Sequence, residues 1–229
     1  MIPETENNYS NKIILTDKPL NITSADVVYR IKRNFDLKKA GHAGTLDPKA
    51  TGLLILCTDK MTKRISEFMT MEKEYTGIIR IGAVTKTYDT ESEEENHMDV
   101  SHINDEDINN AIKEFSGEIE QTPPAHSAVK INGKPVYKLA RKGEEVKLEP
   151  RKVLIKSIEI NRISEKDLLF RIVCSKGTYI RALANDIGRK LKVGGYLKEL
   201  RRERIGEFNT EGLTEEIKGI KFRVLQENV

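Results

Sequence analysis

The segment Gly41–Pro48 (GHAGTLDP) combines residue types that can do chemistry in one short stretch. Its carboxylate, Asp47, has a reference pKa of about 3.9, so it is ionised at neutral pH and can serve as a nucleophile and leaving group. Two glycines let the backbone turn tightly or approach a ligand, and Pro48 biases Asp47 toward an extended conformation. The alternative is an ordinary turn in which Asp47 bonds its own backbone and His42 is a satisfied polar residue.

Three further segments have unusual composition, and each also has an ordinary structural interpretation. Tyr75 in KEYTG could simply be a strand aromatic on a half-buried face. The segment Cys174–Arg181 predicts a strand, a glycine turn and a helix start, and such a helix start can bind anions. Leu200–Arg202 (LRR) could be a basic surface patch. None of these segments decides the function alone.

The charge distribution favours a polyanionic partner. The chain has 39 Lys and Arg against 36 Asp and Glu, yet residues 89–107 hold nine acids and no Lys or Arg, so the remainder carries 39 − 27 = +12. The basic residues gather in the stretches 30–42, 127–152 and 189–204. Solvated helix faces are the alternative interpretation, but three separate stretches favour nucleic acid.

Composition excludes several classes of protein. No run of about 18 apolar residues exists, which excludes a transmembrane helix, and the N-terminus lacks the features of a secretory signal. Cys57 and Cys174 lie in apolar runs and are expected to be reduced core residues, and no Cys/His cluster predicts a metal site. We therefore expect a cytoplasmic protein without a bound metal.

The pattern of apolar residues predicts an α+β domain with a mixed, mostly antiparallel sheet flanked by helices, because strands and helices do not alternate regularly. The acidic stretch 89–107 is expected to form an exposed loop. The predicted strands are 13–15, 53–57, 74–81, 153–160, 168–175 and 205–208. The predicted helices run from 23 or 24 to 35, 61 to 69, 105 to 116 and 178 to 191, with a short helix carrying Leu197 and Leu200.

The joint order of these segments resembles the TruB family, the bacterial tRNA pseudouridine synthases that modify uridine 55 in the T loop of tRNA. The resemblance covers roughly residues 13–208, and the pair GTLDP and GTYIRALA is specific. The matching pieces are DKP (17–19), TSADVVYRIKR (23–33), AGHAGTLDPKATGLLILC (40–57), KEYTG (73–77), QTPPAHSAVKINGKPVYKLAR (121–141), SKGTYIRALANDIG (175–188) and YLKELRRERIGEF (196–208).

This resemblance implies an isomerase that needs no cofactor, since the reaction moves uracil from N1 to C5 linkage without net oxidation. It assigns Asp47 as the nucleophile and Arg181 as the ion partner that keeps Asp47 charged and oriented. Tyr75 matches a tyrosine that stacks on the uracil and could assist proton removal at C5. The remaining matched positions are substrate-binding: His42 holds the T loop, Tyr179 and Leu200 line the pocket, and Lys18 and Pro19 support Tyr75.

The same resemblance implies tRNA as the partner, a target base flipped out of its stack, and a single catalytic domain over residues 1–229. A basic insertion at about 122–150 is expected to clasp the T loop, with a hairpin turn at Asn132–Gly133. A guide RNA, a membrane and a C-terminal PUA domain are not expected, and the predicted state is a monomer.

Two positions depart from the family pattern. Asn21 stands where glycine is usual and is the next best residue for a left-handed backbone. His126 stands where tyrosine is common.

The sequence leaves three alternative functions open. They are a guide-RNA-dependent synthase, a non-catalytic tRNA-binding or tRNA-folding chaperone, and a metal-dependent phosphohydrolase that uses Asp47 and the acidic stretch.

Overall fold

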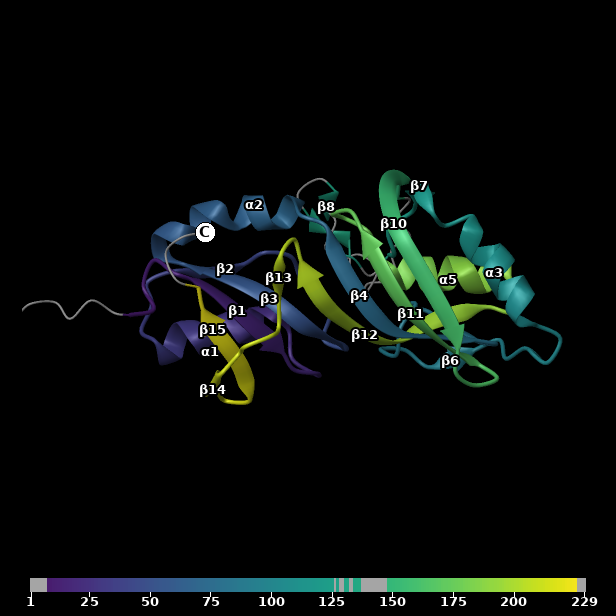
Figure 1. Cartoon of the computed structure of the whole chain (residues 1–229), viewed down its shortest axis with the longest axis horizontal. Coiled ribbons are helices and arrows are strands. Elements are labelled where there is room, and N and C mark those ends of the chain that lie inside the picture. Colours follow the sequence, from purple (N-terminus) through teal and green to yellow (C-terminus); the bar gives the residue numbers. More distant parts are fainter. Residues whose placement is uncertain (1–7, 126, 128–129, 132–133, 137–147, 226–229) are drawn as a thin grey trace, which may run out of the picture. The chain divides into compact units, whose positions relative to one another are not determined.

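The computed structural model describes residues 8–125, 127, 130–131, 134–136 and 148–225. The chain divides into two compact units, one drawn from Met1–Glu74 and Arg201–Val229 and the other from Tyr75–Leu200. Strands β4 (Lys73–Ile81) and β12 (Gly195–Ile205) contribute residues to both units. The expected α+β class with mostly antiparallel pairing is confirmed (Figure 1).

The first unit is a sheet with the strand order β14-β15-β1-β3-β12, and β2 pairs with β3. Strand β1 is antiparallel to both β3 and β15. Its elements are β1 (Ile13–Lys18), α1 (Ser24–Asn34), β2 (Ala40–His42), β3 (Ala50–Thr58), the 3-10 helix η1 (Asp59–Arg64), α2 (Ile65–Thr70), β13 (Phe208–Asn209), β14 (Glu215–Ile217) and β15 (Ile220–Val224).

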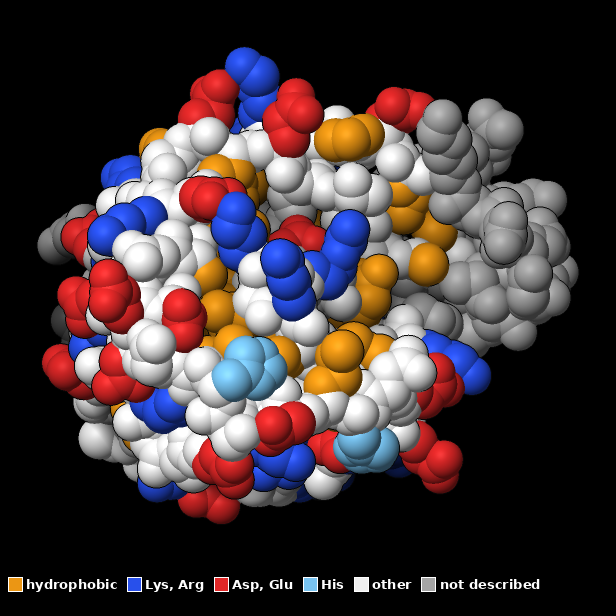
Figure 2. All heavy atoms as spheres, turned by 90° about the vertical axis from the view of Figure 1, so that its right-hand side faces the viewer, with side chains coloured by type: hydrophobic (Ala, Val, Ile, Leu, Met, Phe, Trp, Pro, Cys, Tyr) orange, Lys and Arg blue, Asp and Glu red, His pale blue; other side chains and the backbone are white. Residues whose placement is uncertain are grey.

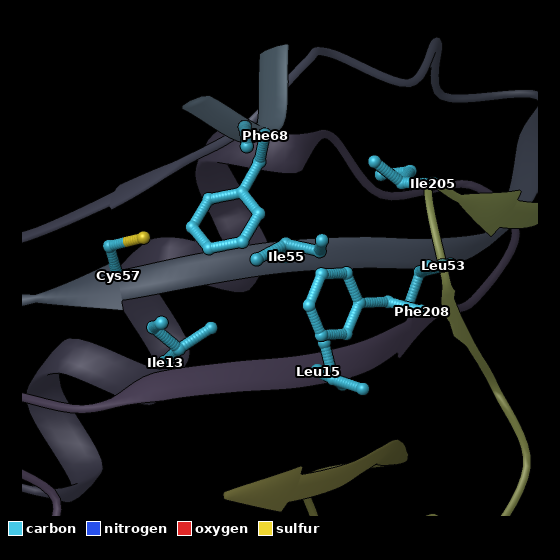
Figure 3. Packing of buried hydrophobic residues seen from close by; sticks show 9 residues of the cluster. Ile13, Leu15, Leu53, Ile55, Cys57, Phe68, Ile205 and Phe208 are labelled. Atoms are coloured by element: carbon cyan, nitrogen blue, oxygen red, sulfur yellow. The ribbon is translucent and has the colours of Figure 1, made fainter. Parts of the chain in front are cut away.

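The core of the first unit lies on both faces of β1 and β3, because successive side chains of an apolar strand point to opposite faces. One face packs against α2, in a cluster of Ile13, Leu15, Ala43, Leu53, Ile55, Cys57, Phe68, Ile205 and Phe208 (Figure 3). The other face packs against α1, in a cluster of Ile14, Val27, Ile31, Leu37, Leu54, Leu56, Ile220 and Phe222.

Both cysteines are free thiols buried in the core, as the sequence predicts. Cys57 is fully buried on β3, and burial raises the pKa of its thiol to about 11. Such a thiol stays protonated at neutral pH and is therefore a weak nucleophile. Cys174 ends β11 and is also shielded from solvent.

The second unit is a sheet with the strand order β12-β4-β11-β10-β7. Strand β10 is antiparallel to both β11 and β7. The other elements are β5 (Val84–Thr85), β6 (Glu94–Glu95), α3 (Asp105–Lys113), β7 (Gly117–Gln121), β8 (Lys130–Ile131), β9 (Lys134–Pro135), β10 (Arg151–Arg162), β11 (Asp167–Cys174) and α5 (Ile180–Lys190). β8 and β9 pair antiparallel as a hairpin requires, although the predicted turn at residues 132–133 lies outside the described residues.

The predicted short helix with Leu197 and Leu200 is wrong, because both residues lie in strand β12. Their spacing of three fits a helix, but charged side chains between and after them pair with residues on other strands of the sheet. Lys198 bonds Asp167 at 2.8 Å, and Arg201 bonds Asp17 at 2.8 Å. Strand formation here depends on such cross-strand partners, which local propensity does not reveal.

The acidic stretch 89–107 is not simply an exposed loop, which corrects the expectation. Asp89, Val100 and Ile103 are buried, and the last three acids open α3, where Asn104 and Asp107 form a capping box. Few apolar residues therefore suffice to attach this stretch to the unit.

Smaller differences concern the ends of elements. The helix expected at 61–69 is a 3-10 helix followed by α2, and the strand expected at 205–208 is a turn that joins β12 to β13. Strands β14 and β15 were not predicted. Within the described parts of the chain, no helix is long and apolar enough to cross a membrane.

Candidate active site

The loop that joins β2 to β3 in the first unit carries Asp47, and its main chain is held on both sides of this residue. The Ser24 hydroxyl, at the start of α1, accepts from the Leu46 N–H at 2.9 Å and donates to the Leu46 carbonyl at 3.1 Å. The Pro48 carbonyl accepts from the Asn21 N–H at 2.8 Å. Asp47 is thus presented by a loop whose path is fixed through neighbouring peptide groups.

Asn21 adopts the left-handed conformation that the sequence analysis expected of it, with φ of +64°. Asparagine tolerates this region better than most residues with a side chain. Its amide oxygen also accepts from the Lys49 Nζ at 3.0 Å. The exchange of glycine for asparagine therefore leaves the turn intact.

Lys18 is fully buried at the end of β1, next to the Asp47 loop. Its Nζ donates to the carbonyls of Pro19 at 2.9 Å, Ile22 at 2.8 Å and Pro48 at 3.4 Å. Burial lowers the pKa of Lys18 to about 8, while the Asp47 carboxylate favours the charged ammonium. A buried cation thus lies close enough to act on the candidate nucleophile.

His42 ends β2 and is half-buried. Burial, and then the positive charge of Arg202, hold the pKa of its imidazole below the usual value. Its Nδ1 is buried and bonds no other atom in the part of the chain that the structure describes. A neutral imidazole has one donor and one acceptor nitrogen, so His42 can bind a polar ligand without adding charge.

Arg181 lies in the first turn of α5 in the second unit and is 6% exposed. Its Nη1 donates to the Thr87 carbonyl at 3.0 Å, and its Nε lies 3.5 Å from Oδ2 of Asp89. The Asp89 carboxylate also accepts from the Thr87 hydroxyl at 2.6 Å and the Glu91 N–H at 2.9 Å. Asp89 is therefore itself held in place and orients the guanidinium of Arg181.

Tyr179 stands immediately before α5, where its peptide group is fixed by one buried amide. The Gln121 Oε1 accepts from the Tyr179 N–H at 2.8 Å, and the Gln121 Nε2 donates to the Tyr179 carbonyl at 3.0 Å. The Arg151 guanidinium lies 4.8 Å from the centre of the Tyr179 ring and donates to the Gly177 carbonyl at 2.7 Å. Gln121 and Arg151 face each other across β7 and β10, so the paired ends of these two strands position Tyr179.

Tyr75 and Leu200 lie on the adjacent strands β4 and β12 of the second unit. Tyr75 is 9% exposed, and Leu200 is half-buried. The two strands approach closely here, since a Cβ on Gly77 would overlap the Glu199 carbonyl. A glycine two residues after Tyr75 is therefore required by packing.

The structure thus gathers the predicted residues into two groups. The first unit brings Lys18, Pro19, His42 and Asp47 to one loop, and the second holds Tyr75, Tyr179, Arg181 and Leu200. The pairing of Asp47 with Arg181, and the support of Tyr75 by Lys18 and Pro19, join residues of different units and stay predictions.

Chemically, the two groups are complementary. The first offers a carboxylate, a neutral imidazole and a buried cation, and the second offers a fixed guanidinium and two aromatic rings. A carboxylate can attack an electrophilic carbon or take a proton, while an aromatic ring can stack on a planar base. Among the residues that the structure describes, no group of three or more His, Cys, Asp or Glu is placed to hold a metal ion.

Sequence reasoning missed four residues that position these groups: Asp89, Gln121, Arg151 and Arg202. Each acts through a partner 26 to 158 residues away in the chain, so local patterns could not reveal it. Arg202 offered no local signal, because its sequence neighbours Arg201, Glu203 and Arg204 are charged as well. Asp89 offered none, since it looked like one acid of many.

The stretch 189–204 was expected to supply free positive charge, and the structure limits this. Lys190 bonds Glu114, Lys198 bonds Asp167, and Arg204 bonds Glu72 and Glu74. On the face that Figure 2 shows, basic and acidic side chains are interspersed. Much of the charge in this stretch therefore serves the fold.

The comparisons with known proteins give one consistent result. The family model described as "TruB family pseudouridylate synthase (N terminal domain)" matches residues 32–180. The chain is 45% identical to tRNA pseudouridine synthase B of Flavobacterium johnsoniae, over 90% of this chain and 93% of the relative. It is 47% identical to the protein of the same name from Bacteroides fragilis, over 87% of this chain and 88% of the relative.

A solved structure is similar as well. The structure titled "Crystal Structure of a Cbf5-Nop10-Gar1 Complex" matches with a TM-score of 0.69 and 33% identity. The match covers 89% of this chain and 51% of the solved one, so this chain spans about half of that neighbour. From the family match, the identities and the fold together, the chain belongs to the TruB family of pseudouridylate synthases.

Proposed function

We propose that this chain is a cytoplasmic tRNA pseudouridine synthase that isomerises uridine 55 in the T loop of tRNA to pseudouridine. It acts as a monomer without a guide RNA or cofactor. The observation that carries the proposal is 45–47% identity to proteins named tRNA pseudouridine synthase B over nearly the full length of both chains. The fixed loop around Asp47 supports it, because this loop holds a carboxylate beside a buried cation.

The reaction breaks the bond between C1′ and N1, turns the uracil, and forms a bond between C1′ and C5. The C5 proton leaves and N1 gains a proton, so atoms balance and no electron acceptor is needed. Asp47 is the nucleophile in this proposal, and it is released when the new bond forms. The buried Lys18 ammonium interacts electrostatically with the Asp47 carboxylate.

The residues of the second unit hold the base and complete the charge balance. Tyr75 stacks on the uracil, which stabilises a flipped-out base by about 1–3 kcal/mol. Arg181 is the ion partner of Asp47 in this proposal, while Asp89 and Thr87 fix the direction of its guanidinium. Tyr179 and Leu200 line the pocket.

The target base must leave its stack in the tRNA before the chemistry can begin. Unstacking costs a few kcal/mol, and phosphate contacts offset this cost. In the proposal His42 holds the T loop with its neutral imidazole, and the insertion at about 122–150 clasps the loop from outside. Most of that insertion lies outside the described residues, so its role stays a prediction.

The proposal is tested by tritium release from tRNA labelled at C5 of uridine, with wild type and Asp47→Asn. We expect Asp47→Asn to lower the rate by about 10³-fold or more, because the amide cannot form the covalent bond. Equal binding of tRNA by both proteins would show that chemistry, and not folding, was lost. Asp105→Asn is the matched control, since this exposed carboxylate opens α3.

The same assay separates the alternatives. Wild-type protein that binds tRNA but releases no tritium would support a non-catalytic chaperone and contradict the proposal. Release only after addition of a guide RNA would support a guide-dependent synthase. Release that stops on removal of divalent cations by a chelator, with tRNA folding unchanged, would point to metal-dependent chemistry.

A further inference from the structure

Arg202 is among the largest fully buried side chains of the protein, with 1% of its surface exposed. It lies on β12 in the first unit. Arginine is almost never fully buried unless its charge is compensated, because removing a guanidinium from water is costly. In the described part of the chain, Arg202 forms no ion pair and instead donates to main-chain carbonyls.

The contacts of Arg202 join the Asp47 loop to the strand that follows it. Its Nε donates to the Leu53 carbonyl on β3 at 2.8 Å, and its Nη2 donates to the Gly44 carbonyl at 3.0 Å. Gly44 has a φ of +93°, so its carbonyl points where a residue with a side chain would rarely direct it. A planar guanidinium can bridge two carbonyls at a fixed separation, which an ammonium cannot do with the same geometry.

The backbone of Arg202 is fixed as firmly as its side chain. A Cβ on Gly52 would overlap the backbone nitrogen, carbon and oxygen of Arg202, so β12 lies directly against β3 at this point. The guanidinium therefore extends from a rigid base. Because β12 packs directly on β3, the guanidinium that bonds the Gly44 carbonyl is itself held by two packed strands.

Two buried cations consequently hold the two ends of the loop. Arg202 bonds the Gly44 carbonyl before Asp47, and Lys18 bonds the Pro48 carbonyl after it. The charge of Arg202 also acts on its neighbours, since it favours the neutral forms of both Lys18 and His42. Arg202 therefore supplies both hydrogen-bond donors and positive charge at this place.

We propose that Arg202 is a positioning residue for Asp47: its guanidinium fixes the Gly44 end of the loop against β3 and supplies positive charge beneath it. The inference rests on the proposed function in that it assigns Asp47 the reaction. It adds a group that touches neither substrate nor reacting atom.

The test compares Arg202→Met, which removes the charge and both hydrogen bonds, with Arg202→Lys, which keeps the charge alone. We expect kcat for tRNA to fall about 10- to 100-fold in Arg202→Met, because a displaced nucleophile loses its alignment. KM should stay within about threefold, since a buried guanidinium cannot contact a phosphate. Arg202→Lys should also lower kcat, but less.

The second readout is the pKa of His42, followed by NMR, and it does not depend on any activity. Arg202→Met should raise this pKa because a nearby positive charge is lost, whereas Arg202→Lys should leave it close to wild type. Phe222→Leu is the stability control, because it removes core volume in the same unit behind α1. It should reduce the free energy of unfolding without changing kcat or the His42 titration.

The outcomes are distinguishable from failure of the proposed function. If the wild type has no activity on tRNA, the proposed function is wrong. The pKa of His42 in wild type and Arg202→Met would still show whether Arg202 supplies positive charge beside the loop. Folded Arg202→Met with kcat within twofold of wild type would overturn the inference. A loss of kcat no larger than that in Phe222→Leu of equal stability would overturn it too. Should Arg202→Met not fold, an unchanged kcat in Arg202→Lys would count equally against it.

Discussion

The two units hold their site residues in different ways. In the first, the main chain around Asp47 is anchored through peptide groups: Ser24 bonds Leu46, and buried Lys18 and Arg202 bond carbonyls on either side, while the Lys18 ammonium also acts on the Asp47 carboxylate. In the second, the contacts go directly to the residue in question, such as Asp89 on the Arg181 side chain.

This difference predicts different consequences of substitution. A change in the first unit should shift a whole loop and disturb every residue on it. A change in the second unit should release one side chain or one peptide and leave the rest in place. Three substitutions can break or sharpen this comparison.

The largest effect is expected for Asp89→Asn. The amide can still accept from the Glu91 N–H, but it no longer offers a charge to Arg181, which is 6% exposed. We expect kcat to fall by about 10- to 100-fold, with tRNA affinity within about twofold, because only the guanidinium is released. Single-turnover tritium release and a filter-binding assay measure the two quantities.

Asp99→Asn is the control for that experiment. The Asp99 carboxylate also accepts from an N–H two residues ahead, that of Ser101, but it is exposed. Asp99→Asn should change neither kcat nor the affinity for tRNA. A drop in tRNA affinity as large as the drop in kcat for Asp89→Asn would contradict the view that only one side chain is released.

A smaller effect is expected for Gln121→Leu, which leaves the Tyr179 N–H and carbonyl without their partners. We expect a roughly tenfold loss of kcat, because an unpaired buried polar group costs about 1–3 kcal/mol and the segment before α5 will move to satisfy it. Faster hydrogen exchange at the Tyr179 amide should accompany the loss. Glu120→Leu, an exposed position on the same strand, should do neither.

The smallest effect is the pH-dependent part of the stability that Lys18 contributes, which is measured by comparing wild type with Lys18→Met at alkaline pH. The folded-state pKa of Lys18, about 8, lies below the ordinary 10.5, so between these values the unfolded chain binds more protons. The free energy of unfolding of wild type should therefore rise relative to Lys18→Met, by about 1 kcal/mol from pH 8 to pH 9. Well below pH 8, where Lys18 is protonated in both the folded and the unfolded chain, the difference between the two proteins should no longer change with pH through this group.

Urea unfolding at several pH values measures this difference. Lys221→Met is the control, since Lys221 is exposed on β15 of the same unit. A difference between wild type and Lys18→Met that is flat from pH 7 to pH 10 would argue that Lys18 keeps an ordinary pKa. Lys18 would then bond the main-chain carbonyls without any cost of burying its charge.

Elements with a strong local signal could be predicted from the sequence. Thr23 and Asp26 form the capping box that starts α1, and the apolar run of β3 is buried as expected. α5 also begins within two residues of its predicted start. These signals lie within a few residues of the structure they specify, so no tertiary context is needed.

Features that depend on distant partners could not be predicted. The spacing of Leu197 and Leu200 predicts a short helix, whereas the Asp167 and Asp17 partners of the charged residues in β12 lie on other strands. Arg202 looked like a surface arginine, whereas its partners, the Gly44 and Leu53 carbonyls, lie about 150 residues earlier in the chain. The candidate site was therefore named mainly by resemblance, and its supports became visible only in the fold.

The unreactive thiols of Cys57 and Cys174, together with the lack of tryptophan, make this chain a convenient host for spectroscopic reporters. A cysteine introduced at the exposed position Lys60 and another at Lys176 would each be alkylated selectively, because the native thiols are buried and at least Cys57 stays protonated. One such label sits in each unit. A fluorescent dye at either position would report, in real time, when RNA arrives at the unit that carries the dye and when product leaves.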